Sequence, residues 1–226
     1  MCGRFTLTAP AEIIAEAFLL QDVPASLSPR YNVAPTQQVP VIVQEGGTRR
    51  LDLVRWGLIP SWAKDPAIGS RMINARGESL ADKPSFRSAL HKRRCLVLAD
   101  GFFEWQKEGR KRLPVYFRLR SRRPFAFAGL WERWRSPDGE EVRSCTVITG
   151  EPNELVRTVH DRMPAMLRPE AEDAWLSPVL PVPDGVPDLL VPYPANLMEA
   201  LPVSTVVNSP KNDIPECIEP LSEEHA

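Results

Sequence analysis

The chain has 226 residues, of which 43% are hydrophobic and 25% charged. These are ordinary values for a globular protein, and they exclude a fibrous or wholly disordered one. Compared with a usual domain of about 150 residues, the length favours one large domain, residues 1–226. No apolar run approaches the ~18 residues of a membrane span, and the first residues lack the features of a signal peptide. We therefore expect a cytoplasmic protein with no membrane partner.

Proline is the unusual component of the composition. The 24 prolines are about twice the usual share of roughly 5%. They predict stiff, irregular connections, above all over residues 177–194. The acidic tail after about residue 215 is expected to fray.

Positive and negative charges are segregated along the chain, although the formal net charge is only -1. Residues 1–135 carry 23 Lys and Arg against 12 Asp and Glu, whereas residues 136–226 carry 5 against 17. Such asymmetry indicates a polyanionic partner. The basic residues form three clusters, at 91–94, 110–112 and 118–123. The alternative is that each cluster is only a solvated loop or an exposed strand face.

In chain order, the first expected element is a helix over residues 10–20, with Thr8 as its candidate cap. A hairpin of strands 38–44 and 49–59 follows, joined through Glu45-Gly46-Gly47. Further helices are expected at 85–92, 153–159 and 169–176, and further strands at 95–99, 102–106, 114–119, 125–134 and 143–149. Because these successive strands lack helix-length crossovers, antiparallel pairing is favoured. The predicted class is α+β, with curved, mainly antiparallel sheets and a few peripheral helices.

The four cysteines do not form a metal-binding pattern, because they show no C-x-x-C pair and no histidine at metal spacing. Cys95 and Cys145 lie in apolar runs that predict buried strands, where a thiol behaves as a small hydrophobe. Cys217 lies in the acidic tail and is interpreted as incidental. We expect neither a metal nor an organic cofactor.

Cys2 is the most informative residue. Methionine before a small side chain is commonly removed, and its removal would leave Cys2 with a free α-amino group beside its thiol. The ordinary pKa values, about 7.7 to 8.0 and 8.5, leave both groups available as nucleophiles near neutral pH. Amine and thiol together can close an aldehyde into a thiazolidine, or Cys2 can attack an amide as an N-terminal nucleophile. A disordered end is the alternative, but Arg4-Phe5-Thr6-Leu7 predicts a strand that holds the terminus in the fold.

Three other polar residues are candidates for chemistry. Glu104 is flanked by aromatic residues, and a carboxylate in apolar surroundings has a raised pKa that suits a general acid or base. His160 is the best placed of three histidines to titrate near neutrality. The alternatives are an arginine partner for Glu104 and a helix-capping or core role for His160. Asn74, taken alone, is a turn former.

Tryptophans accompany the basic clusters and could stack on unpaired bases while arginines hold the backbone. We expect most of the six to be buried in the core, including Trp56, Trp131, Trp134 and Trp175. Trp62 stands in a loop-like context between two prolines, which favours exposure.

Six ordered motifs carry a resemblance to a known family: MCGRF (1–5), RYNVAPT (30–36), WGLIPSW (56–62), INAR (73–76), DGFFEW (100–105) and VHDRMP (159–164). In this order they closely resemble the SRAP family, the SOS-response-associated peptidases, over nearly the whole chain. The resemblance implies a single compact SRAP-like domain that recognises abasic sites in single-stranded DNA and links to them through the N-terminal cysteine as a thiazolidine. It also implies a monomer that associates with the nucleoid when bound to DNA.

The resemblance further implies roles for individual residues. Cys2, Asn74, Glu104 and His160 match the family's catalytic positions. Arg4, Arg76 and Arg162 match its phosphate contacts, and Trp62 with Pro35 match its wedge against bases. We assign His160 to protonating the sugar ring oxygen and Glu104 to the Cys2 amine, an assignment that could be exchanged. Two rivals stay open: a peptidase or autopeptidase that uses Cys2, and a non-covalent single-stranded DNA-binding module.

Overall fold

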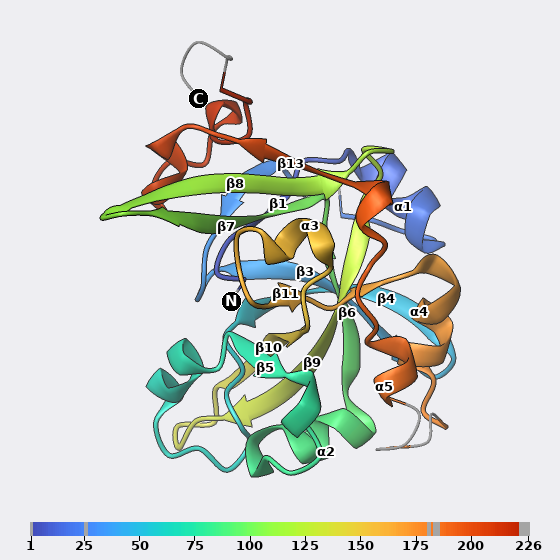
Figure 1. Cartoon of the computed structure of the whole chain (residues 1–226). Helices are drawn as coiled ribbons and strands as arrows, with labels where there is room; N and C mark the ends of the chain where they lie inside the picture. Colours follow the sequence, from blue (N-terminus) through green and yellow to red (C-terminus); the bar gives the residue numbers. More distant parts are fainter. Residues whose placement is uncertain (1, 25–26, 180–181, 183–185, 222–226) are drawn as a thin grey trace.

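The computed structural model describes residues 2–24, 27–179, 182 and 186–221. Thirteen named strands form two sheets, and the helices are short and lie at the periphery (Figure 1). Nearly all strand pairs are antiparallel, as the sequence predicts. The exceptions are β10 with β4 and β10 with β5, which are parallel. The α+β class with mainly antiparallel sheets is confirmed.

The larger sheet closes on itself like a barrel. Its strands are β3 (Gln38–Glu45), β4 (Thr48–Trp56), β5 (Asn74–Arg76), β6 (Arg94–Ala99), β9 (Phe125–Arg135), β10 (Glu141–Gly150), β11 (Met163–Pro164) and β12 (Met166–Leu167). Strand β10 pairs with β4 and also with β9, which completes the ring β10-β4-β3-β6-β9. Closure removes the exposed edges that an open sheet of these strands would present.

The second sheet has the order β13-β8-β7-β1-β2. Its strands are β1 (Phe5–Leu7), β2 (Arg30–Val33), β7 (Gly101–Glu108), β8 (Lys111–Leu119) and β13 (Met198–Pro202). Asp100, just before β7, accepts hydrogen bonds from the side chain of Thr6 and from the backbone N–H groups of Thr8 and Ala9. The N-terminal strand is thereby held between β7 and β2, so the terminus is held in the fold, as the sequence predicts.

Four helices pack on the outside of the barrel: α1 (Ala11–Phe18), α2 (Pro84–Lys92), α4 (Pro169–Leu176) and α5 (Val186–Leu189). The fifth, α3 (Glu154–Arg157), packs near β13 of the second sheet. The expected cap of the first helix is wrong: Pro10 occupies the cap position, and the Thr8 hydroxyl donates to Asp100 at 2.7 Å. Within the described ranges, no helix is long and apolar enough to cross a bilayer.

Both faces of the barrel wall are buried, which explains the uninterrupted apolar run of β6. Cys95 and Val97 pack into the barrel interior with Trp56 and Phe127, whereas Leu96 packs outward. The outward cluster includes side chains from α1, α2 and α4, namely Ile14, Phe18, Ala89, Leu90 and Trp175. Cys145 is buried like Cys95, so the structural interpretation of both thiols is confirmed.

The C-terminal segment packs on the second sheet. A short 3-10 helix, Pro215–Cys217, buries Cys217 against Phe103 and Tyr116. The expectation of a frayed tail from about residue 215 is therefore wrong for residues 215–221, and Cys217 belongs to this small core. The remainder of that prediction falls on residues 222–226, outside the described residues.

The loop after β4 is closed by two glycines. Gly57 has a φ of +127°, and a Cβ placed on it would lie 2.6 Å from the carbonyl oxygen of Gly69. A side chain at Gly57 would therefore force the loop open. The loop is tied further by Trp134, whose indole N–H donates to the Ala63 carbonyl at 2.7 Å.

Candidate functional site

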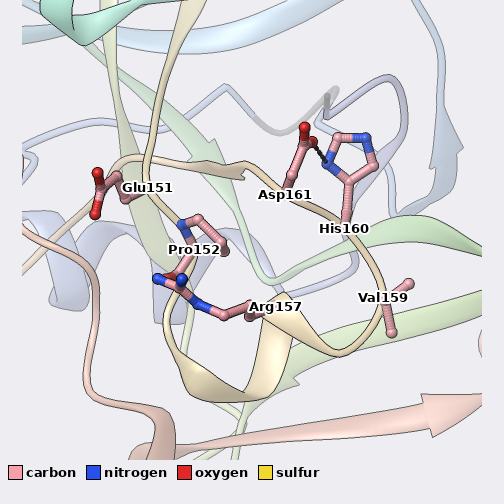
Figure 2. Close-up of a pocket in the computed structure, with 6 residues that line it drawn as sticks. All are labelled: Glu151, Pro152, Arg157, Val159, His160 and Asp161. Atoms are coloured by element: carbon pink, nitrogen blue, oxygen red, sulfur yellow. Dashed lines mark hydrogen bonds and ion pairs between the residues drawn. The ribbon is translucent and has the colours of Figure 1, made fainter.

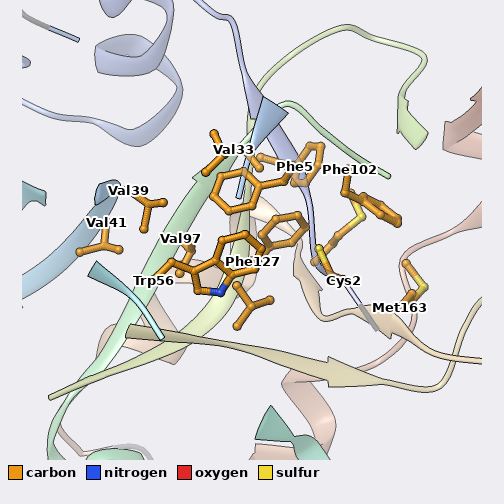
Figure 3. Packing of buried hydrophobic residues seen from close by; sticks show 14 of the residues in the cluster. Cys2, Phe5, Val33, Val39, Val41, Trp56, Val97, Phe102, Phe127 and Met163 are labelled. Atoms are coloured by element: carbon orange, nitrogen blue, oxygen red, sulfur yellow. The ribbon is translucent and has the colours of Figure 1, made fainter. Parts of the chain in front are cut away.

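Cys2 is fully buried and packs in the interior cluster, near Phe102 and Met163 (Figure 3). Phe5, Phe102 and Met163 belong to the same cluster. Burial raises the pKa of the Cys2 thiol well above its usual range, and the carboxylate of Glu104 adds to that rise. The thiol is therefore protonated at neutral pH in this state.

Asn74 fixes the position of Cys2. It begins β5, beside Val147 of β10, and its Nδ2 donates to the carbonyl oxygen of Cys2 at 2.7 Å. Its Oδ1 is buried and has no hydrogen-bond partner among the described residues. The interpretation of Asn74 as a turn former is wrong, because it lies in a strand and clamps the terminus.

Glu104 and His160 line one cavity of about 650 Å³. Glu104 is in β7 and only 3% exposed, whereas His160 follows α3. Burial raises the pKa of Glu104, and a positive charge on His160 opposes that rise. The charge of Glu104 also raises the pKa of the Cys2 thiol, so Glu104 is coupled electrostatically to both His160 and Cys2. Asn74 is joined to this group by its hydrogen bond to Cys2.

His160 faces two competing partners. Its Nδ1 accepts a hydrogen bond from the Arg162 backbone N–H at 3.0 Å, and the Asp161 carboxylate lies 3.0 Å from the same nitrogen. Neutral imidazole can accept from Arg162, whereas imidazolium must donate and would turn to Asp161. Figure 2 shows this pair at the wall of a second cavity of about 340 Å³, which Arg157 also lines.

Two of the expected phosphate contacts are bound to protein groups. The Arg4 guanidinium donates to Asn32 at 2.7 Å and to the Val207 carbonyl at 2.8 Å, and it lies over the Trp105 ring. The Arg162 guanidinium forms a bidentate ion pair with Glu78 at 2.8 and 2.9 Å. A phosphate would have to displace these partners.

Other candidate contacts are accessible. Arg76, at the end of β5, is exposed. Trp62 is 58% exposed, which confirms that expectation, while Trp56, Trp131, Trp134 and Trp175 are buried, as expected. Pro35 lies half-buried in the turn between β2 and β3.

Folding pairs part of the charge that is segregated along the sequence. Arg30 pairs with Asp213, Arg49 with Glu172 and Asp173, Arg118 and Arg122 with Glu199, and Arg133 with Glu141. In the basic cluster at 91–94, Arg93 pairs with Glu132 and Arg94 is buried against Trp175. In the clusters at 91–94 and 118–123, Arg93, Arg94 and Arg118 are therefore bound within the protein, which differs both from a solvated surface and from a free phosphate contact.

Sequence reasoning missed several residues at the site. Lys107, Arg112 and Arg157 line the cavities beside His160, and Asp161 contacts it. The cluster at 110–112 signalled part of this, but the approach of the segment after α3 to β7 has no local signal. No group of three metal-binding side chains occurs among the residues that the structure describes.

Comparison with known proteins gives consistent results. The family model described as "SOS response associated peptidase (SRAP)" matches residues 1–210. The "Abasic site processing protein YoqW" of Bacillus subtilis is 49% identical over 97% of this chain and 99% of its own length. The "Abasic site processing protein HMCES" of Xenopus tropicalis is 31% identical over 96% of this chain and 78% of its own.

A solved structure from Bacteroides thetaiotaomicron superposes with a TM-score of 0.87 at 28% identity, covering 98% of this chain and 100% of that one. Fold, sequence motifs and family model thus agree over nearly the whole length. The chain belongs to the SRAP family.

Proposed function

We propose that this protein processes abasic sites in single-stranded DNA by bonding covalently to the lesion through Cys2. The names of its relatives support abasic sites as the target. The observation that carries the proposal is the clamp on Cys2: Asn74 holds its carbonyl group while Glu104 and His160 share the adjoining cavity.

The chemistry begins with loss of Met1, which frees the α-amino group of Cys2. An abasic sugar is mainly a closed hemiacetal and must open to its aldehyde before attack. The Cys2 amine then adds to the aldehyde carbon, and the carbinolamine expels one water to give an imine. The thiol adds to the imine carbon and its proton passes to the nitrogen, so a thiazolidine forms with net loss of one water. No oxidant or metal is needed for this balance.

The order of attack follows from the burial of the thiol. A thiol whose pKa is raised is a poor first nucleophile, because only the thiolate attacks readily. The amine therefore reacts first and the thiol closes the ring. Once the imine has formed, its carbon is held beside the sulfur, and this proximity offsets the low reactivity of the thiol.

The two titratable groups supply the proton transfers. His160 donates to the ring oxygen of the sugar as it opens, and Glu104 takes a proton from the Cys2 amine. The raised pKa of Glu104 makes it a stronger base than an exposed carboxylate and suits it to transfers near neutral pH. Since both line one cavity, they can act on one sugar.

The strand is held by the exposed groups around this centre. Arg76 offers a charge for a phosphate at the end of β5, while Trp62 and Pro35 offer surfaces for bases. Phosphate contacts by Arg162 and Arg4 remain predictions. To bind a phosphate, Arg162 would have to release Glu78, and Arg4 would have to release the Val207 carbonyl group of the C-terminal segment.

The test is denaturing electrophoresis of the protein mixed with abasic single-stranded DNA. The proposal expects an adduct that survives denaturation in the parent and is lost in Cys2→Ala, which retains only the amine. Complexes that vanish on denaturation would favour a non-covalent module. Turnover of peptides without DNA would favour a peptidase.

A further inference from the structure

The hairpin of β7 and β8 carries a pair of cations without acidic partners. Lys107 and Arg112 stand directly opposite each other in the register of the two strands. Like charges in this position destabilise a hairpin, whereas the next pair toward the turn, Glu108 with Lys111, is complementary. A repulsive pair one step from a complementary one indicates that something outside the hairpin uses the charge.

The local environment leaves the charge of both cations exposed. Both are exposed, and neither forms an ion pair with any acidic side chain in the described part of the chain. Arginines of the other two basic clusters do find such partners, as Arg93 does in Glu132 and Arg118 in Glu199. The charge of the hairpin is therefore available for an external anion.

The pair also lines the cavity of the candidate site. Lys107 and Arg112 share the cavity of about 650 Å³ with Glu104 and His160. Two acidic groups, Glu104 and Asp161, line the same cavity. Of these, Glu104 is only 3% exposed, whereas Asp161 lies 3.0 Å from the Nδ1 of His160.

We propose that Lys107 and Arg112 form a phosphate subsite for the nucleotides that flank the abasic sugar on one side. The inference rests on the proposed function for the identity of its ligand. Cys2 lies between Asn74 of β5, to which it is hydrogen-bonded, and Glu104 of β7. Arg76 ends β5, whereas Lys107 is in β7 and Arg112 in β8, so positive charge comes from two separate elements that each contribute a residue near Cys2. A bound strand would therefore meet Arg76 and the hairpin at different phosphates.

The experiment measures non-covalent affinity at several salt concentrations. The probes are two single-stranded oligonucleotides that carry a tetrahydrofuran abasic analogue, which cannot react, with flanking nucleotides either only 5′ or only 3′ of it. The double variant Lys107→Gln/Arg112→Gln should bind one probe more weakly and leave the other unchanged. For that probe the slope of log affinity against log salt should fall by about 1.4, from two contacts at about 0.7 each.

The matched control is Arg110→Gln/Lys111→Gln, which removes the same charge from the same hairpin but outside the cavity. Equal behaviour of the two double variants, or equal weakening of both probes by Lys107→Gln/Arg112→Gln, would overturn the subsite. Because the analogue cannot cross-link, this outcome is independent of the adduct test. An adduct without the salt effect refutes only the subsite, and the salt effect without an adduct refutes only the covalent chemistry.

Discussion

Asn74 holds Cys2 by a single hydrogen bond, from its Nδ2 to the Cys2 carbonyl oxygen at 2.7 Å. The bond joins the start of β5 to the residue that would become the N-terminus. It therefore fixes the direction in which the amine of Cys2 is presented. Asn74 is only half-buried, so its role in the site can be separated from its role in stability.

Asn74→Ala should slow cross-linking about 10-fold, which corresponds to one ordinary hydrogen bond of about 1.4 kcal/mol. Asn74→Asp should be slower still, because it replaces the donor with an oxygen facing the carbonyl. Rates are measured at saturating abasic DNA, with thermal unfolding as the control for folding. An Asn74→Ala protein that reacts at the parent rate would show that the clamp plays no part.

His160→Gln should slow cross-linking by about 10²- to 10⁴-fold while DNA affinity stays nearly unchanged, the range typical of a positioned acid or base. The parent should show a bell-shaped rate profile from about pH 5 to 9, because protonated imidazole and deprotonated amine are needed together. The two limbs belong to the coupled set of groups rather than to single residues. A variant as fast as the parent throughout this range would rule out the proton transfer.

Asp161→Asn tests the second partner of His160. Loss of the carboxylate 3.0 Å from Nδ1 removes an acceptor whose negative charge favours the protonated ring. The basic limb of the rate profile should therefore move to lower pH, while the maximal rate stays close to that of the parent. Asp138→Asn, on the β9–β10 turn, is the charge-matched control, and identical profiles for the two variants would contradict the role.

Glu78→Gln should strengthen binding to single-stranded DNA and steepen its salt dependence by about 0.7, because Arg162 then has no competing carboxylate. Glu151→Gln is the matched control, an exposed acid near the same sheet edge. The hydrogen bonds from Arg162 hold the pKa of Glu78 below its usual range. The stability difference from the parent should therefore be present at neutral pH and disappear as the pH falls through that lowered pKa. Weaker DNA binding by Glu78→Gln would contradict this competition and would show that Glu78 holds Arg162 in place for DNA.

Glu172 predicts a pH dependence of stability away from the site. Burial raises its pKa to about 7, although Arg49 opposes the shift. A raised pKa in the folded state means that the folded chain binds the proton more tightly than the unfolded chain. The resulting contribution of Glu172 to the free energy of unfolding is complete below the ordinary pKa near 4.3 and is lost as the pH rises to about 7. Glu172→Gln should flatten stability against pH in that window relative to the parent. Parallel curves from urea unfolding would contradict it.

Local sequence patterns predicted the elements of this fold better than their long-range arrangement. The hairpin of β3 and β4 and the buried strand β6 were predictable because alternation, glycine and apolar runs act over a few residues. The parallel pairs of β10 were not, because nothing in β10 marks β4 or β5 as a neighbour. The cap of the first helix was mispredicted, because Asp100, distant in sequence, takes the Thr8 hydroxyl.

The site shows the same difference between local patterns, which were predictable, and long-range arrangement, which was not. The motifs pointed to Cys2, Glu104 and His160, but their sharing of one environment depends on the segment after α3 lying across a cavity from β7. The charge asymmetry overstated the free positive charge, because pairs such as Arg118 with Glu199 form only on folding. Lys107 became a candidate only once the hairpin register set it opposite Arg112.

Covalent capture of an abasic site by Cys2 can be measured by intact mass spectrometry of the purified protein before and after mixing with abasic single-stranded DNA. We expect a starting chain without Met1, and a denaturation-resistant product whose mass is the sum of chain and DNA less one water. Cys2→Ala should give no such product, and at most an imine that can be trapped by reduction. An unchanged stable adduct from Cys2→Ala, or no adduct from a parent chain that has lost Met1, would contradict the account.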